Sequence, residues 1–524
     1  RRVGVDPRGR PIREKEIYAP LTTRVLNGKI VRDPFPGNII PMRRIDPIAA
    51  KIQSLIPPAT SSSAVNNFAL LDHSSQTMMI PSVKIDQNFG PTSKVSFYWS
   101  EFRHDEPKAS VDGLPWPISP GRKQTTRTNI FRLNLDKTLT SDMFLHFGIG
   151  ETRYLHSDSA PPSVLDYGAE ANLGLVGCSI SSCPFPELTG LGSLSGAGFT
   201  DTSDIGLTNA GFYTENTPTV VGSLTWAKGN HSYKAGGEWH EDLWTDLESV
   251  GTGGVYNFAS SETGLPYLQA PSVNGGDVGF PYASFLLGQA DSASVRNGQE
   301  PNMRKYGYGL YVQDTWKATS KLTLDYGLRY DYQQAYSESR NRLSEFAPSI
   351  SNPSAGGLLG ATKYQSNGKF TKTYPYAIGP RIGIAYELNS KTVLRGGWGI
   401  VYGATPGTQY MTGTQIIGTG GWGVLDFSST SFGSPGAVLQ NGLQYPTSAF
   451  TAGALSAGIR PSPGQINPPP YYIDPQAGRP ARTNQYNITV ERQLARNLAL
   501  EASYVGNRGV WLQSDLMDLN ANTA

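Results

Sequence analysis

The feature that most constrains this chain is an apolar/polar alternation with a period of two. It is cleanest over residues 321–333, where Leu322, Leu324, Tyr326, Leu328, Tyr330 and Tyr332 share one face. The intervening residues are Thr323, Asp325, Gly327, Arg329, Asp331 and Gln333. Successive side chains of a β-strand point to opposite faces of its sheet, so this pattern predicts a strand with one apolar and one polar face.

The predicted strands come in pairs joined by tight turns, such as Gly229-Asn230, a good two-residue hairpin signal. Six hairpins, or about twelve strands, are predicted. They pair Val83–Asn88 with Lys94–Arg103, Thr128–Lys137 with Met143–Leu155, Val220–Lys228 with His231–Leu243, Lys305–Trp316 with Lys321–Gln333, Ile382–Leu388 with Thr392–Tyr402, and Tyr486–Leu494 with Leu498–Val510.

The connections between hairpins are long and rich in Gly, Pro, Ser, Thr and Asn. They cover residues 104–124, 157–212, 250–303, 335–373 and 405–480. Long structureless loops are uncommon in compact soluble domains, whereas outer-membrane barrels combine short periplasmic turns with long extracellular loops. The sequence therefore predicts an all-β fold, an antiparallel transmembrane β-barrel. A sandwich or propeller also fits the alternation but leaves the two classes of connection unexplained.

The two faces of the predicted barrel can be assigned from residue type. Apolar residues expected to face lipid are Phe131, Leu133, Leu135, Leu145, Phe147, Ile149, Leu394, Trp398, Ile400, Ile488, Val490, Leu498 and Leu500. Residues expected to face the lumen are Lys234, Glu238, His240, Arg329, Asp331, Glu491, Glu501 and Ser503. Tyr and Trp gather near strand ends, where their amphipathic rings suit the headgroup level. Asp314 interrupts an otherwise apolar face.

Composition agrees with this interpretation. Only 38% of residues are hydrophobic and 16% are charged, which is low for a globular chain but suits a barrel in which alternate strand residues are apolar. No apolar run is long enough for a transmembrane helix. The net charge of +2 argues against a nucleic-acid partner.

Residues 1–77 are Pro-rich and mostly without periodicity. One short helix is predicted after Asp46, a suitable N-cap with Pro47 behind it; its apolar stripe is Ile48, Ile52, Leu55 and Ile56. We therefore expect two regions: residues 1–77, an extracellular loop region with this helix, and residues 78–524, a partial outer-membrane β-barrel. Both termini have the character of fragment boundaries.

Few residues point to chemistry. Cys178 and Cys183 are the only cysteines and favour a local disulfide; a zinc site would need further ligands, and free thiols are the remaining alternative. Glu238-Trp239-His240-Glu241 resembles the start of a zinc-protease motif, but Trp244 stands where the second His is required. His104-Asp105-Glu106 has no ligand spacing.

We accordingly expect no enzyme: no catalytic, cofactor-binding or metal residues are predicted. The ligand is unknown. Loop tyrosines could stack on a carbohydrate or another planar ligand, or simply pack within the loops. They are Tyr256, Tyr267, Tyr410, Tyr471 and Tyr472.

Several segments resemble the Oar-like TonB-dependent receptors, which are large outer-membrane proteins. They are Asp33–Pro41, Arg44–Lys51, Tyr311–Lys317, Leu322–Asp331 and Glu501–Gly509. The resemblance implies a 22-stranded barrel closed by a plug and driven by the TonB complex. About twelve strands, with no plug, no TonB box and no terminal aromatic strand, would make this chain an internal barrel fragment.

The leading hypothesis is a partial TonB-dependent receptor that imports a scarce nutrient across the outer membrane. Its partners would be membrane lipid, a small ligand and, by resemblance, the TonB complex. A complete twelve-stranded passive channel or adhesin is the alternative if Val83–Asn88 pairs with Leu498–Val510. A secreted carbohydrate-binding β-protein is the third.

Overall fold

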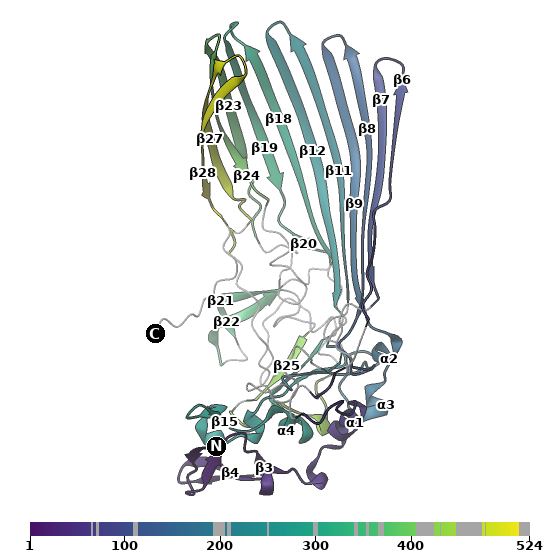
Figure 1. Cartoon of the computed structure of the whole chain (residues 1–524), viewed down its shortest axis with the longest axis vertical. Helices are drawn as coiled ribbons and strands as arrows, with labels where there is room; N and C mark the ends of the chain where they lie inside the picture. Colours follow the sequence, from purple (N-terminus) through teal and green to yellow (C-terminus); the bar gives the residue numbers. More distant parts are fainter. Residues whose placement is uncertain are drawn as a thin grey trace.

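The computed structural model describes residues 1–63, 67–69, 73–107, 114–191, 205–206, 211–248, 251–296, 302–339, 344–352, 356–364, 371–404, 424–429, 431–446, 474–476 and 478–512. Its dominant element is one large antiparallel sheet of long, side-by-side strands (Figure 1). Helices are few and short. The prediction of an all-β, antiparallel fold is confirmed.

In the part of the chain that the structure describes, the sheet has fourteen strands. They are β5 (Thr77–Met79), β6 (Ser82–Phe89), β7 (Ser93–Glu106), β8 (Lys123–Thr140), β9 (Met143–Ser159), β11 (Gly211–Lys228), β12 (His231–Glu248), β18 (Asn302–Lys317), β19 (Leu322–Gln333), β20 (Ser337–Glu338), β23 (Ala377–Asn389), β24 (Thr392–Tyr402), β27 (Arg482–Ala495) and β28 (Leu498–Val510). The order is β28-β27-β24-β23-β19-β18-β12-β11-β9-β8-β7-β5; β6 also pairs with β7, and β20 with β18.

Every predicted hairpin is present in this sheet, as β6–β7, β8–β9, β11–β12, β18–β19, β23–β24 and β27–β28. Their short turns collect at one end of the sheet, at the top of Figure 1, and the long connections leave from the other end. Several strands are longer than the sequence suggested. β8, β11 and β12 each have 18 residues, or about 60 Å of extended chain, and so reach well beyond an apolar band about 25 Å tall.

The sheet has two free edges among the described residues. β28 pairs only with β27, and β6 pairs only with β7. A closed barrel of twelve strands requires β6 to pair with β28, and these two strands do not meet. The closed twelve-stranded arrangement is therefore not the one observed.

The segments leaving the long-loop end fold together with the N-terminal residues into what we call the loop domain: residues 1–56, 114–122, 160–191, 205–206, 251–296, 424–429 and 431–446. Its elements are β1 (Arg2–Val5), β2 (Pro11–Arg13), β3 (Tyr18–Leu26), β4 (Lys29–Pro34), η1 (Pro36–Asn38), η2 (Met42–Arg44), α1 (Pro47–Leu55), α2 (Pro162–Leu165), α3 (Ala169–Leu173), β10 (Glu187–Thr189), β13 (Val255–Asn257), η3 (Ser261–Thr263), η4 (Pro266–Leu268), β14 (Ser272–Val273), β15 (Gly276–Asp277), α4 (Pro281–Leu286), β16 (Gln289–Ala290), β17 (Ser292–Arg296), β25 (Val424–Ser428), β26 (Ala437–Val438) and η8 (Leu439–Asn441). A separate hairpin, β21 (Ser344–Asn352) with β22 (Leu358–Tyr364), belongs to the connection that joins β19 to β23 in the sequence.

The described residues of the loop domain form several clusters of buried apolar side chains, and the largest of these, which we call the shared core, joins most of its segments. It buries Ile52, Ile118, Leu188, Phe285 and Leu439, each less than 1% exposed, from five segments far apart in sequence. The expectation of structureless loops is thus wrong for these segments. Each supplies too few apolar residues to show a pattern, but together they bury enough apolar surface to order their backbones.

The predicted helix is α1. The Asp46 carboxylate accepts hydrogen bonds from the backbone N–H groups of Ile48 and Ala49, at 2.8 and 3.1 Å, which satisfies donors that a helix start leaves free. Ile48, Ala49 and Ile52 are buried in the shared core. None of the described helices is both long and apolar enough to cross a membrane.

Candidate functional site

The polar face of the large sheet gathers the charged residues that the sequence placed in the lumen. We define this polar face by Lys234, Glu238 and His240 of β12 and by Arg329 and Asp331 of β19. Glu238 lies opposite Gly309 of β18, and Gly309 lies opposite Asp331. Directly opposite residues share one face of a sheet, so the intervening strand carries a glycine between two acids.

Arg329 is the centre of this group. Its guanidinium contacts Glu238 of β12 and donates to Asp331 Oδ1 at 2.8 Å. The side chains of Arg329 and Asp331 are 24% and 18% exposed, so the pair is partly desolvated and less screened than a surface ion pair. The contact fixes a cation between two acids that would otherwise repel each other.

Two glycines of β18 make room for these side chains. A Cβ at Gly309 would lie 2.4 Å from Arg329 Nη2, and one at Gly307 would lie 2.7 Å from His240 Cε1. Both distances are far below van der Waals contact. The alternating glycines therefore allow the large polar side chains of β12 and β19 to lean across β18.

The polar face contains a cavity of about 400 Å³, within the usual range for small-molecule sites. The charged and aromatic residues that line it are Glu238, His240, Asp242, Lys305, Tyr308, Arg329, Asp331, Tyr332, Arg381 and Tyr402. Three acids balance three permanent cations, so the cavity has mixed charge and suits polar rather than strongly anionic or cationic ligands.

The sequence pattern anticipated four of these residues and missed Asp242, Lys305 and Arg381. Lys305 is only 6% exposed; its ammonium lies 3.2 Å from Asp242 and 4.7 Å from the centre of the Tyr336 ring. Its position in register with Asp242 could have been found by aligning β12 with β18. Arg381 is in register with Gly399, and no sequence signal connected it to β12.

The opposite face is apolar. Leu133 lies opposite Ile149, and Leu135 lies opposite Phe147; Leu133, Phe147 and Ile149 are between 38% and 44% exposed. So much exposed aliphatic and aromatic surface on long strands is unfavourable in water and favourable against lipid.

An aromatic group marks the short-turn end of the apolar face, as the sequence suggested. The His231 ring stacks on both Tyr233 and Trp316, at centroid distances of 5.3 and 5.4 Å. Asp314, which interrupts the apolar pattern, belongs here: it accepts from the Tyr326 hydroxyl at 2.7 Å and lies 2.6 Å from His231 Nδ1. The charge thus sits within a hydrogen-bonded girdle at the end of the strand.

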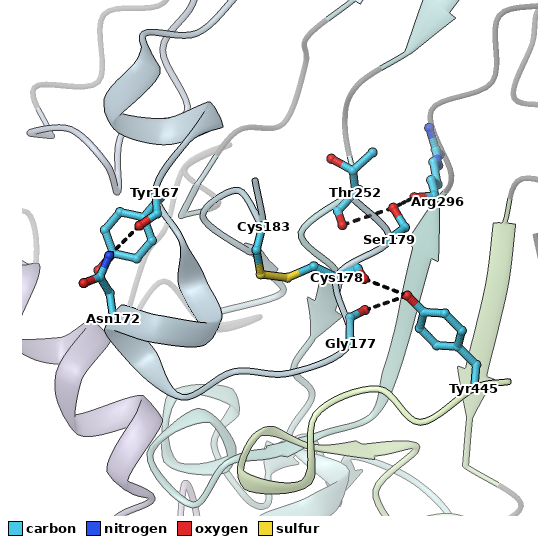
Figure 2. Close-up of a disulfide and its surroundings, with 9 residues drawn as sticks. All are labelled: Tyr167, Asn172, Gly177, Cys178, Ser179, Cys183, Thr252, Arg296 and Tyr445. Carbon is cyan, nitrogen blue, oxygen red and sulfur yellow. Dashed lines mark hydrogen bonds between the residues drawn. A yellow bond between two sulfur atoms is a disulfide. The ribbon is translucent and has the colours of Figure 1, made fainter. Parts of the chain in front are cut away.

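Cys178 and Cys183 lie in the loop domain and are joined by a disulfide, with Cα atoms 5.3 Å apart (Figure 2). The Tyr445 hydroxyl donates to the carbonyl oxygens of Gly177 and Cys178, at 3.2 and 2.9 Å. Ser179 N donates to the Thr252 carbonyl at 3.0 Å. The disulfide loop therefore holds three of the long connections together.

Two of the five loop tyrosines considered as ligand-stacking residues pack against other parts of the loop domain. Tyr256 is 1% exposed in the shared core, so packing explains it and stacking on a ligand does not. Tyr267 packs beside the first hairpin, with Lys29 over its ring. Tyr410, Tyr471 and Tyr472 lie outside the described residues.

The segment His104-Asp105-Glu106, expected at the start of a long connection, is not a loop but the end of β7. His104, Asp105 and Glu106 continue that strand, which is longer than predicted, and Asp105 pairs with Arg103. Within the part of the chain that the structure describes, no three His, Cys, Asp or Glu side chains gather as metal ligands.

Arg32 and Glu262 are two ionisable side chains that are buried in the loop domain. Arg32 is 3% exposed; its guanidinium donates to the Glu262 carbonyl at 2.6 Å, the Gly264 carbonyl at 3.2 Å and Thr23 Oγ1 at 2.9 Å. Burial lowers the pKa of Arg32 to about 10. The Glu262 side chain is fully buried, and burial, with the Asp291 carboxyl nearby, raises its pKa to about 7.

Residues 7–524 match the family described as outer membrane beta barrel domain. No curated protein matches the sequence. Solved structures similar to it include the ferric-catecholate import receptor Fiu of Escherichia coli K12 (12% identity, TM-score 0.37, covering 82% of this chain and 51% of that chain).

Two others are a mutant of the ferric enterobactin receptor PfeA of Pseudomonas aeruginosa (9% identity, TM-score 0.38, 89% and 46%) and the ferric yersiniabactin uptake receptor FyuA of Yersinia pestis (9% identity, TM-score 0.36, 87% and 48%). The chain spans about half the length of these structures. The family match covers nearly the whole sequence: the chain belongs to the outer membrane beta barrel domain family and is an outer-membrane protein, not an enzyme.

Proposed function

We propose that this chain is part of an Oar-like TonB-dependent receptor that imports a small nutrient across the outer membrane. The observation that carries the proposal is the mixed-charge cavity around Arg329 on the polar face, because a lumen lined by polar groups offers a binding surface along the route of a solute. The resemblance of Asp33–Pro41 and Leu322–Asp331 to Oar-like receptors supports the subtype.

In this proposal residues 1–77 are extracellular and residues 78–524 form part of a larger barrel. The two free edges of the sheet support that division, since a complete barrel leaves no edge strand unpaired. The long connections would then capture the ligand, and energy from the TonB complex would drive its passage. The import receptors reported above offer a precedent for such a function.

A genetic test separates energised uptake from passive diffusion. Strains lacking the gene for this protein, lacking TonB, or lacking both would be grown on limiting carbon and iron sources. We expect the first two to share a growth defect on one nutrient and the double mutant to be no worse. A defect that adds to the loss of TonB, and that disappears at high nutrient concentration, would instead identify a passive channel.

Variants at the cavity connect uptake to the site. Arg381→Ala removes a lining cation and is expected to reduce growth on that nutrient. Arg395→Ala is the matched control, because Arg395 lies on an adjacent strand outside the cavity, with a side chain that is 58% exposed and 3.6 Å from Glu491. Equal growth of the two variants would place the ligand route elsewhere.

A further inference from the structure

A small sheet in the loop domain has one apolar and one polar face. Its strand order is β10-β13-β17-β25. Tyr256, Ala293 and Leu425 point into the shared core and are 1%, 5% and 6% exposed. The residues that alternate with these along each strand must therefore point away from the core. On β13, β17 and β25 most of these alternating residues are polar.

The polar face borders a second cavity, of about 340 Å³. On this face, two rows of directly opposite residues run across the three strands. They are Val255–Ser294–Asp426 and Asn257–Ser292–Ser428. Opposite Cβ atoms in antiparallel strands lie about 5 Å apart. The cavity therefore presents three hydroxyls, an amide and a carboxyl on one rigid surface, at spacings that suit a molecule the size of one sugar ring.

Asp426 has a buried carboxylate oxygen that lacks a hydrogen-bond donor among the described residues. Its Oδ2 is buried and accepts no hydrogen bond from any of the described residues, which is costly for a carboxylate oxygen. Burial raises the pKa of Asp426 to about 6, although the positive charge of Arg296 acts in the opposite direction. Asp426 also lines the cavity, so its carboxyl group is placed to accept a hydrogen bond from a ligand hydroxyl there.

The charges beside the cavity determine what kind of molecule fits. Arg296 follows Ser294 by two residues on the same face of β17 and is close enough to influence Asp426 electrostatically. A cationic ligand would meet Arg296, and an anionic ligand would meet Asp426. A neutral ligand avoids both repulsions.

We propose that this cavity binds a small neutral polyhydroxyl compound, a monosaccharide or the terminal sugar of a glycan, with Asp426 accepting from ligand hydroxyls and Ser294, Ser292 and Asn257 completing the contacts. Hydrogen bonding rather than ring stacking provides recognition, because none of the residues that line the cavity is aromatic. The proposal concerns binding alone and holds whether or not transport is energised.

The test measures binding of D-glucose, myo-inositol and maltotriose to the purified full chain in detergent by calorimetry, with glucosamine and gluconate as charged analogues. At least one neutral probe is expected to bind saturably in the millimolar range. Glucose binding without maltotriose binding identifies a free monosaccharide as the ligand, and the reverse identifies a glycan end. Either result supports the site.

Variants then assign binding to this cavity. Asp426→Asn is expected to weaken binding of the neutral probe about tenfold or more, and Ser294→Ala several-fold. Asp166→Asn is the control, since Asp166 is an exposed residue of the loop domain that does not line the cavity. Near-ultraviolet circular dichroism identifies any variant that has lost its fold, and Ser294→Ala keeps the proposal testable if Asp426→Asn does so.

Three results would overturn the proposal. The first is that no neutral probe binds. The second is that a charged analogue binds more tightly than its neutral parent. The third is that folded Asp426→Asn and Ser294→Ala proteins both bind as tightly as the wild type.

Discussion

The buried Glu262 makes the stability of the loop domain depend on pH in an unusual direction. Ser261 Oγ lies 2.7 Å from Glu262 Oε1 and 3.2 Å from Asp291 Oδ1, so a single hydroxyl bridges two carboxyls. Glu262 Oε2 is buried without a hydrogen-bond partner among the described residues. The protonated side chain suits this environment better than the carboxylate does, because none of the described cationic side chains bonds to the Glu262 carboxyl group.

The size of the effect follows from the pKa. Burial first, and then the charge of Asp291, raise the pKa of Glu262 from 4.5 to about 7. Between these two values the folded state holds a proton that the unfolded state has released, so stability falls as pH rises. At about 1.4 kcal/mol per pH unit, the loss is roughly 3 kcal/mol, fully present above the folded pKa and absent below the unfolded one.

Glu262→Gln is expected to remove this dependence, because glutamine resembles the protonated acid and does not titrate. Hydrogen exchange of peptides covering residues 258–291, in the purified full chain at pH 5 and pH 8, measures local opening. Wild-type protection relative to Glu262→Gln should fall roughly 100-fold between the two pH values. Glu170→Gln, at an exposed position on α3, should behave as the wild type. Parallel pH dependence in wild type and Glu262→Gln would refute the reasoning.

Three further predictions concern the sheet and the loop domain. Leu133→Arg on the apolar face should destabilise the sheet in lipid vesicles by about 2–4 kcal/mol in urea titrations, whereas Ser223→Arg on the polar face should have little effect; equal losses would mean that the faces are assigned wrongly. Arg32→Ala should cost about 3 kcal/mol, because several buried carbonyls lose their donor, and should expose β3 and β4 to protease; Arg24→Ala, at a side chain that is 40% exposed, should not. Cys178→Ser should lower the free energy of local unfolding by about 2 kcal/mol, as expected for a short disulfide loop. Non-reducing peptide mapping of the wild type should recover Cys178 and Cys183 as a bonded pair. Free thiols at these two positions would contradict this prediction.

The large sheet could be predicted because its pattern is local. The alternation over residues 321–333 sets both the strand and its two faces, and a turn such as Gly229-Asn230 sets the pairing of its neighbours. The strand ends were less certain, since polar residues such as Asp105 and Glu106 can continue a strand beyond the membrane, where no apolar face is required.

The loop domain could not be predicted in the same way. Ile118 and Leu439 lie in short Gly- and Pro-rich segments that show no periodicity, and they become part of a core only when these segments meet in space. Of the two candidate sites, one could be predicted in part and the other could not. Glu238 and Arg329 were placed on the correct face by alternation, but their contact depends on the register between β12, β18 and β19. Asp426 stands in a two-row polar surface built from three distant segments, for which the sequence offers no signal.

The composition of the shared core imposes an order on biogenesis. Its members precede β6, follow β7, β9 and β12, and extend to Leu443, beyond β24. The core can close only when segments separated by five hairpins have come together, so it depends on contacts that are distant along the chain. A chain arrested halfway through insertion would leave these apolar residues in water, open to proteases and chaperones. Closure of this core therefore depends on the segments up to Leu443 and not on β27 or β28, which follow it in the sequence.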